Sequence, residues 1–136
     1  MVLTRSLIFS FTLVIFSFIH SQEIVMGLGA VTDSSAEVTM DTPFDVGGFQ
    51  FDAVGASVTS ASGGLAAEAG FTVSTRGETV LGFSFTGSFI SAGSSGVLTN
   101  LAYTNPTSEI CITDVVLSDP DAIALNVDFI GDCIEY

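Results

Sequence analysis

Apolar side chains alternate with small or polar ones along most of the chain, with a period of two. In the segment ETVLGFSFTG, residues 78–87, one parity holds Thr79, Leu81, Phe83 and Phe85, and the other holds Val80, Gly82, Ser84 and Thr86. Successive side chains of a β-strand point to opposite faces of its sheet, so this pattern predicts a strand with one buried face. We therefore expect the phenylalanines of this segment to fill the core between two sheets.

The same alternation predicts further strands. In GGFQFDAVG, residues 47–55, Phe49 and Phe51 are expected to point inward, and Gln50 and Asp52 outward. The predicted core residues of three later segments are Val97, Thr99, Leu101 and Tyr103; then Cys111, Thr113, Val115 and Leu117; and finally Ile123, Leu125, Val127, Phe129 and Cys133.

Turn residues separate these segments. Arg76-Gly77 predicts a tight turn, SDPDA (118–122) a Pro-Asp turn and SAGSSG (91–96) a surface loop. One short helix is predicted at Leu65–Ala69, where Gly70 ends it. Short strands with one brief helix predict an all-β fold, an antiparallel two-sheet sandwich, and we expect residues 22–136 to form a single domain.

The first 21 residues have the features of a secretory signal peptide. Arg5 precedes an apolar run from Leu7 to Ile19, which is 13 residues long and broken only by Ser and Thr. A helix needs roughly 20 apolar residues to span a bilayer, so this run fits a cleaved signal better, with a cut near Ser21 and Gln22. We therefore expect a secreted protein, extracellular or at the cell surface, with no membrane span after the signal is removed.

Beyond residue 21 the chain is strongly acidic. Arg76 is its one basic residue against all 15 Asp and Glu, which gives residues 22–136 a formal net charge of −14. Nucleic acids are excluded as partners, because phosphate binding depends on Lys and Arg.

The two cysteines, Cys111 and Cys133, form an even pair in a chain with a predicted signal peptide, which predicts a disulfide. Each falls on the apolar parity of its predicted strand, so we expect the bond in or near the core. The alternative, a metal pair, would need further Cys or His ligands, and residues 22–136 have none.

Most catalytic apparatus is absent from the sequence after residue 21. Without His or Lys, a serine nucleophile has no usual base and zinc lacks histidine ligands. A carboxylate pair of the kind used in glycoside hydrolysis is allowed by the composition, but the sequence singles out no two acids for it. We therefore predict a protein that is not an enzyme.

Calcium is the one cofactor for which the sequence offers ligands. Asp119 and Asp121 place two carboxylates in one turn, and Asp114 and Asp128 lie on flanking segments. Calcium takes six to eight oxygen ligands, including the backbone carbonyls of turns. The alternative is a plain Pro-Asp turn, which forms without a metal.

Three segments in order resemble the cohesin-type domain. They are EVTMDTPFDVGGFQFDAVG (37–55), GFTVSTRGETVLGFSFTGSFISAGSSGVLTNLAY (70–103) and ITDVVLSDPDAIALNV (112–127), and the match extends over residues 23–136. The resemblance implies a jelly-roll sandwich of about nine strands. It also implies a non-catalytic binding or scaffolding role, in which one sheet face holds a protein partner, dockerin-like or a surface component.

Two alternatives remain open at the level of sequence. One is a carbohydrate-binding module on the same sandwich, with a polysaccharide as ligand, and the other is a structural unit of a cell-surface or matrix protein. Sugar sites usually stack aromatic rings on the ligand, whereas this chain has no Trp and only two Tyr residues, Tyr103 and Tyr136. No partner-binding residue is identified by a motif.

Overall fold

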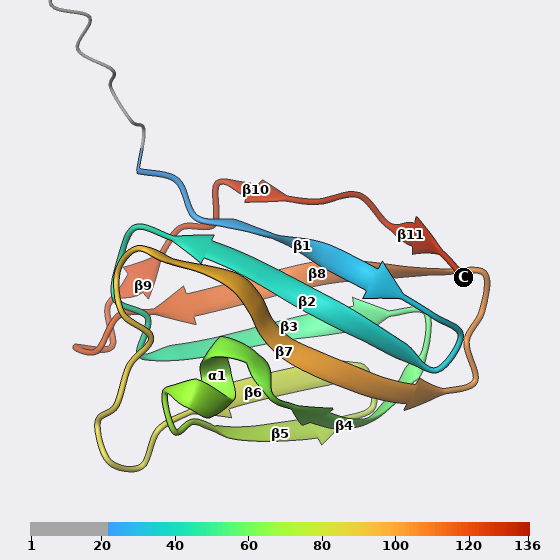
Figure 1. The fold of residues 1–136 in the computed structure, drawn as a ribbon, viewed down its shortest axis with the longest axis horizontal. Coiled ribbons are helices and arrows are strands. Elements are labelled where there is room, and N and C mark those ends of the chain that lie inside the picture. The colour runs from blue at the N-terminus through green and yellow to red at the C-terminus, as the bar shows by residue number, and fades with distance from the viewer. Residues whose placement is uncertain (1–21) are drawn as a thin grey trace, which may run out of the picture.

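The computed structural model describes residues 22–136, so the predicted signal peptide, residues 1–21, lies outside the described residues. Two β-sheets pack face to face, with strand orders β10-β1-β2-β7-β4 and β11-β8-β3-β6-β5, and β9 pairs with β8 (Figure 1). The elements are β1 (Val25–Val31), β2 (Ser35–Thr42), β3 (Gly48–Val54), β4 (Ser57–Ser62), α1 (Gly64–Glu68), β5 (Thr72–Arg76), β6 (Thr79–Phe83), β7 (Ser94–Thr104), β8 (Glu109–Ser118), β9 (Ala124–Leu125), β10 (Phe129–Ile130) and β11 (Ile134–Glu135). All strand pairs are antiparallel except β1 with β10. The predicted all-β sandwich is confirmed.

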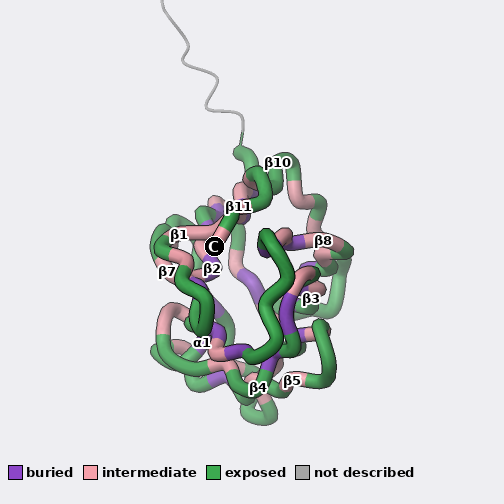
Figure 2. The backbone as a smooth tube through the Cα atoms, turned by 90° about the vertical axis from the view of Figure 1, so that its right-hand side faces the viewer, coloured by how far each residue is buried: buried purple, intermediate pink, exposed green. Residues whose placement is uncertain are grey.

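The core lies between the two sheets, where the buried stretches of the backbone face each other (Figure 2). Its largest fully buried side chains are Phe51, Ile24, Met26, Met40, Ile90, Leu98, Leu101, Ile110 and Leu117. Phe51 stacks with Phe49 at a centroid distance of 6.0 Å, and Phe49 stacks with Phe71 at the same distance. Burial of apolar area is the main favourable term in folding, so these contacts hold the sheets together.

Several predictions of side-chain direction are confirmed. Phe49 and Phe51 are buried and Gln50 is exposed, while Asp52 lies half-buried on the outer side. On β7, the predicted core residues Thr99, Leu101 and Tyr103 are buried. The prediction for Val97 was wrong, because a register shift against β2 pairs it with the outward Thr39, and Leu98 is buried instead. The helix forms one residue earlier than predicted, and the Arg76-Gly77 and Asp119–Ala122 turns form between strands.

The prediction for β6 was wrong, because its faces are reversed. Val80 and Gly82 point into the core, whereas Leu81 is 40% exposed and Phe85 is 81% exposed. Gly82 lies directly opposite Phe49 in the register, and a Cβ at Gly82 would overlap the Phe49 ring. The ring of the neighbouring strand therefore occupies the space that a side chain on this parity of β6 would need.

The prediction for β8 was wrong over its first half. Ile110 and Ile112 are the buried residues there, and Cys111 and Thr113 point outward. The register with β3 shifts next to Asp114, which has φ 51°. Such a bulge adds one residue to a strand and reverses the side-chain parity after it, so Leu117 is buried as predicted.

The C-terminal segment does not form the predicted long core strand. It divides into β9, β10 and β11, which pair in turn with the second, the first and again the second sheet. Ile123 and Phe129 are 61% and 58% exposed, while Leu125 and Val127 are partly buried against the core. Since the segment crosses the open side of the sandwich between the sheet edges, only some of its side chains reach the interior.

A disulfide joins Cys111 and Cys133, with their Cα atoms 4.3 Å apart. Cys111 lies on β8 and Cys133 directly before β11, and the pairing of Ile110 with Ile134 places the two cysteines opposite each other. Cys111 is half-buried and Cys133 exposed, so the prediction of a bond in the core was wrong. The bond lies on the outer side of the second sheet, because the bulge in β8 places Cys111 on the outward parity.

Two tyrosines anchor the C-terminal end against the sandwich. The Tyr103 hydroxyl donates to the carbonyl oxygens of Thr32 and Ser35, and the Tyr136 hydroxyl donates to the carbonyl oxygen of Gly55 at 3.1 Å. The two rings meet edge to face at 5.8 Å. Burial, together with the neighbouring Tyr136 and Asp33, raises the pKa of Tyr103 to about 12, and burial also raises the pKa of Tyr136.

The raised pKa of Tyr103 predicts a loss of stability at alkaline pH. The folded state holds the phenolic proton more tightly than the unfolded chain, whose pKa is 10.0, so this contribution is complete below pH 10.0. We expect the free energy of unfolding to fall as the pH rises from 10.0 to about 12. Urea titrations across this pH range measure the free energy of unfolding. The variant Tyr103→Phe should be less stable at neutral pH, and its free energy of unfolding should fall less steeply as the pH rises above 10.0. An equal slope in both proteins would contradict the role of Tyr103.

The disulfide predicts a second stability effect. Its Cys residues are separated by 22 positions, for which the chain-entropy estimate gives about 3 kcal/mol. We expect urea unfolding with a reductant present to show a free energy lower by about this amount. Cys111→Ala/Cys133→Ala is the matched control, because reductant should leave its unfolding curve unchanged. If reductant leaves the urea unfolding curve of the unsubstituted chain unchanged, the disulfide does not stabilise the fold by restricting the unfolded chain.

Candidate functional site

The outer side of the second sheet is the candidate site. Its outward residues are Cys111, Thr113, Val116 and Ser118 on β8; Gly48, Gln50, Asp52 and Val54 on β3; Thr79, Leu81 and Phe83 on β6; and Thr72, Ser74 and Arg76 on β5. We call this set the β8–β5 face. The inward packing of Phe49, Phe51 and Val80 determines which residues point out, because neighbours in a strand alternate.

Apolar side chains are exposed on the β8–β5 face. Val116 is 59% exposed, Leu81 40% and Val54 39%. Val116 and Leu81 lie on either side of Gln50 in one cross-strand row. Beyond the end of β6, Phe85 meets Phe83 edge to face at 4.8 Å. Exposed apolar residues that gather on one sheet face make that face a candidate interaction surface.

Two shallow hollows flank the Gln50–Leu81 pair. One, of about 260 Å³, is lined by Gly47, Gly48, Phe49, Gln50, Leu81, Gly82, Phe83, Val116 and Ser118. The other, of about 270 Å³, is lined by Gln50, Ser74, Thr75, Arg76, Thr79 and Leu81. Gly48, which points outward in the first hollow, leaves room above the sheet, so Leu81 and Val116 form raised apolar points beside a depression. Such a hollow beside exposed apolar side chains can receive protruding apolar side chains of a partner.

Most of the outward residues of the face carry polar side chains. The Thr79 hydroxyl donates to Asp52 Oδ1 at 2.7 Å, and Arg76, the only basic residue of the described chain, is exposed in the same cross-strand row. Hydrogen bonding and one cation therefore accompany the apolar residues.

The outer side of the first sheet differs. Its outward residues are mostly small or polar: Gly27, Gly29, Glu37, Thr39, Asp41, Ser60, Ser62 and Asn100. Two half-buried valines, Val25 and Val97, lie among them as partners of Asp41 and Thr39. None of the large apolar residues exposed within residues 22–136 lies on β1, β2, β4 or β7, and those of the first sheet, Phe129 and Ile130, are confined to its short edge strand β10. The contrast between the two sheets singles out the β8–β5 face.

The calcium prediction at Asp119 and Asp121 stays a prediction. Asp119 Oδ1 accepts the backbone N–H groups of Asp121 and Ile123, each at 2.9 Å, which shapes the turn. Asp128 Oδ2 accepts the N–H of Ile24 at 2.8 Å, on another part of the molecule. Within the described residues, neither Asp119 nor Asp121 comes together with two other ligand side chains.

Glu109, Cys111 and Cys133 do lie close together, with ligand atoms within 4.8 Å of one another. Both sulfurs belong to the disulfide, so they offer no thiolate to a metal.

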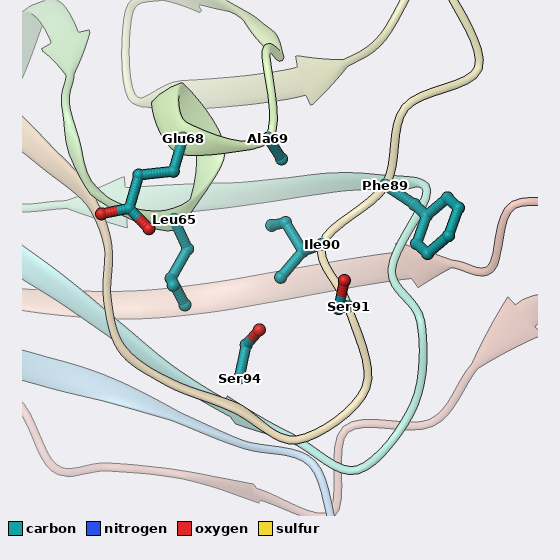
Figure 3. Close-up of a pocket in the computed structure, with 7 residues that line it drawn as sticks. All are labelled: Leu65, Glu68, Ala69, Phe89, Ile90, Ser91 and Ser94. Carbon is teal, nitrogen blue, oxygen red and sulfur yellow. The ribbon is translucent and has the colours of Figure 1, made fainter.

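A third hollow, of about 220 Å³, lies between α1 and the loop before β7 (Figure 3). Leu65 and Ile90 lie in its middle, with Glu68 and Phe89 on opposite sides. Since its polar groups do not converge on one point, it offers no defined binding chemistry.

Residues 22–136 contain no helix that is long and apolar enough to cross a membrane. No protein-family model matches the sequence, and no curated protein matches it. Solved structures do match.

A non-cellulosomal cohesin from the archaeon Archaeoglobus fulgidus is similar, with a TM-score of 0.59 at 14% identity, over 83% of this chain and 90% of that one. The chain has the cohesin fold. The sixth cohesin of Acetivibrio cellulolyticus scaffoldin B, in complex with a Cel5 dockerin mutant, gives a TM-score of 0.55 at 17% identity, over 79% and 94% of the two chains. A Coh-OlpA–Doc918 complex of Clostridium thermocellum gives 0.55 at 14%, over 83% and 98%. The cohesin-type fold predicted from the three sequence segments is confirmed.

Sequence reasoning missed the residues of the candidate site. Leu81, Phe83 and Phe85 were expected in the core, and Val116 and Val54 were not singled out. The available signal was Gly82: a glycine on one parity of a strand, next to a strand with Phe49 and Phe51, indicates that a neighbouring ring fills that position.

Proposed function

We propose that this protein is an exported, non-catalytic binding module that holds a protein partner on its β8–β5 face. The observation that carries the proposal is the cluster of outward apolar residues around Leu81 and Val116 on a sheet with the cohesin fold. Two of the similar cohesins were solved as complexes with a dockerin, which supports a protein as ligand.

The physical argument rests on how the two outer sides differ. Removing Leu81, Val116 and Val54 from water would contribute about 25 cal/mol per Å² of apolar area, while the polar side of the first sheet offers little such gain. Gln50 and Ser74 lie between and beside these residues and can supply hydrogen bonds at the contact. This combination of an apolar centre and polar surroundings is typical of protein interfaces.

Export is part of the same proposal. It is supported by the signal-like sequence of residues 1–21 and by the even pair of cysteines, since disulfides persist in oxidising compartments.

A substitution on the face tests the proposal. The chain 22–136 is immobilised and used to capture proteins from the secreted fraction of its source, and the captured partner is purified for titration. We expect Leu81→Asp to weaken binding by roughly tenfold or more, because a charge replaces an apolar contact at the centre of the interface. Leu81 is 40% exposed, so the variant should fold.

Ser60→Asp is the matched control, since it adds the same charge on the exposed outer side of β4 and should leave the affinity unchanged. Equal binding by both variants would place the contact elsewhere. A glycan array with the same proteins examines the polysaccharide alternative. If a glycan binds with a micromolar Kd and Leu81→Asp abolishes this binding, the ligand of the face is a polysaccharide and not a protein.

A further inference from the structure

The charges around the β8–β5 face are distributed unevenly. Six carboxylates lie along its β8 edge, on β8, on the turn after it and on the C-terminal segment: Glu109, Asp114, Asp119, Asp121, Asp132 and Glu135. All are exposed except Asp119, which is half-buried. At the β5 edge, the exposed Arg76 is followed in the turn by Glu78, so this edge is close to neutral.

Two of the acids are directly opposed. Glu109 and Glu135 are cross-strand partners of β8 and β11, and Glu109 shares the outward parity of Cys111. Side chains in such pairs lie about 5 Å apart, and like charges there repel each other. A cationic group placed between them would relieve this repulsion.

The two edges are too far apart to neutralise each other. Three inter-strand spacings separate β8 from β5, which is roughly 14 Å at about 4.8 Å per strand. Screening reduces exposed charge interactions beyond about 8 Å at physiological ionic strength. A bound partner therefore meets a negative edge and a separate site at Arg76, with the apolar residues Leu81 and Val116 between them.

We infer that the partner docks in one preferred orientation, with a Lys- or Arg-bearing end at the β8 edge and a carboxylate at Arg76. This inference rests on the proposed function, because it assigns the polarity of the ligand on that same face. The reversed orientation would bring carboxylates against the acids of the β8 edge, which is a repulsive contact, and would lose the pairing of a carboxylate with Arg76.

A synthetic helical peptide serves as the probe. A helix rises 1.5 Å per residue, so charges roughly 14 Å apart correspond to about nine residues. The probe carries a leucine stripe, two lysines at one end and two glutamates about nine residues further on. One version has a nitroxide label at the lysine end and another at the glutamate end.

Paramagnetic broadening of the assigned amide signals of residues 22–136 reports the orientation. We expect the lysine-end label to broaden β8 and β11, and the glutamate-end label to broaden β5 and the turn at Gly77. Arg76→Gln should weaken peptide binding by roughly two- to fivefold and make the two patterns more alike. Ser60→Glu changes the net charge by the same amount, but away from the face, and should alter neither the affinity for the peptide nor the two broadening patterns.

A second pair of variants examines the acidic edge. Glu109→Gln/Glu135→Gln should reduce the broadening of β11 by the lysine-end label, while Glu23→Gln/Asp41→Asn, matched in charge, should not. If both labels broaden both edges equally, the inference of a single orientation is wrong while the face remains the binding site. If the peptide broadens signals on other surfaces, or does not bind at millimolar concentration, the inference is also wrong. The proposed function is tested separately, by the binding of the native partner to Leu81→Asp and to its control Ser60→Asp.

Discussion

The packing of Phe49 over Gly82 determines how the second sheet presents itself. Phe49 belongs to the inward row of β3, and its ring needs the space above the neighbouring strand that only a glycine leaves. Gly82 and Val80 therefore face the core, and by alternation Leu81 and Phe83 face outward. The apolar character of the β8–β5 face is thus a consequence of the core and not an independent feature.

The turns and the end of the short helix were indicated by Gly, Pro and Asp residues. Alternation along the sequence predicted strands at the positions of β3, β6, β7 and β8, and with them the sandwich, because each depends on local spacing, but it did not single out β1, β2 or β4. It could not decide which parity faces inward where both contain apolar residues, as in Val80 against Leu81. In β3 the contrast between Phe49 and Gln50 is strong, and the prediction was right. In β6 the decision came from a residue on another strand, which a reading of one segment does not include.

Two other departures have structural causes outside simple periodicity. The bulge at Asp114 inserts one residue into β8, so an uninterrupted alternation assigned Cys111 to the wrong face. The segment after Ile123 runs along the open side of the sandwich, from the edge of one sheet to the edge of the other, and pairs only two residues at a time, so no single parity applies to it. The export signal and the calcium ligands remain predictions, the first because residues 1–21 lie outside the described part.

The disulfide changes how the C-terminal end would carry mechanical load. β11 pairs through only two residues, so a pull on Tyr136 would unzip it easily if hydrogen bonds alone held it. The Cys133–Cys111 bond instead transfers the tension covalently into β8, which is paired with β3 over most of its length. Extension would then stop at Cys133 until the second sheet itself is sheared, so the cross-link converts a weak peeling geometry into a strong one.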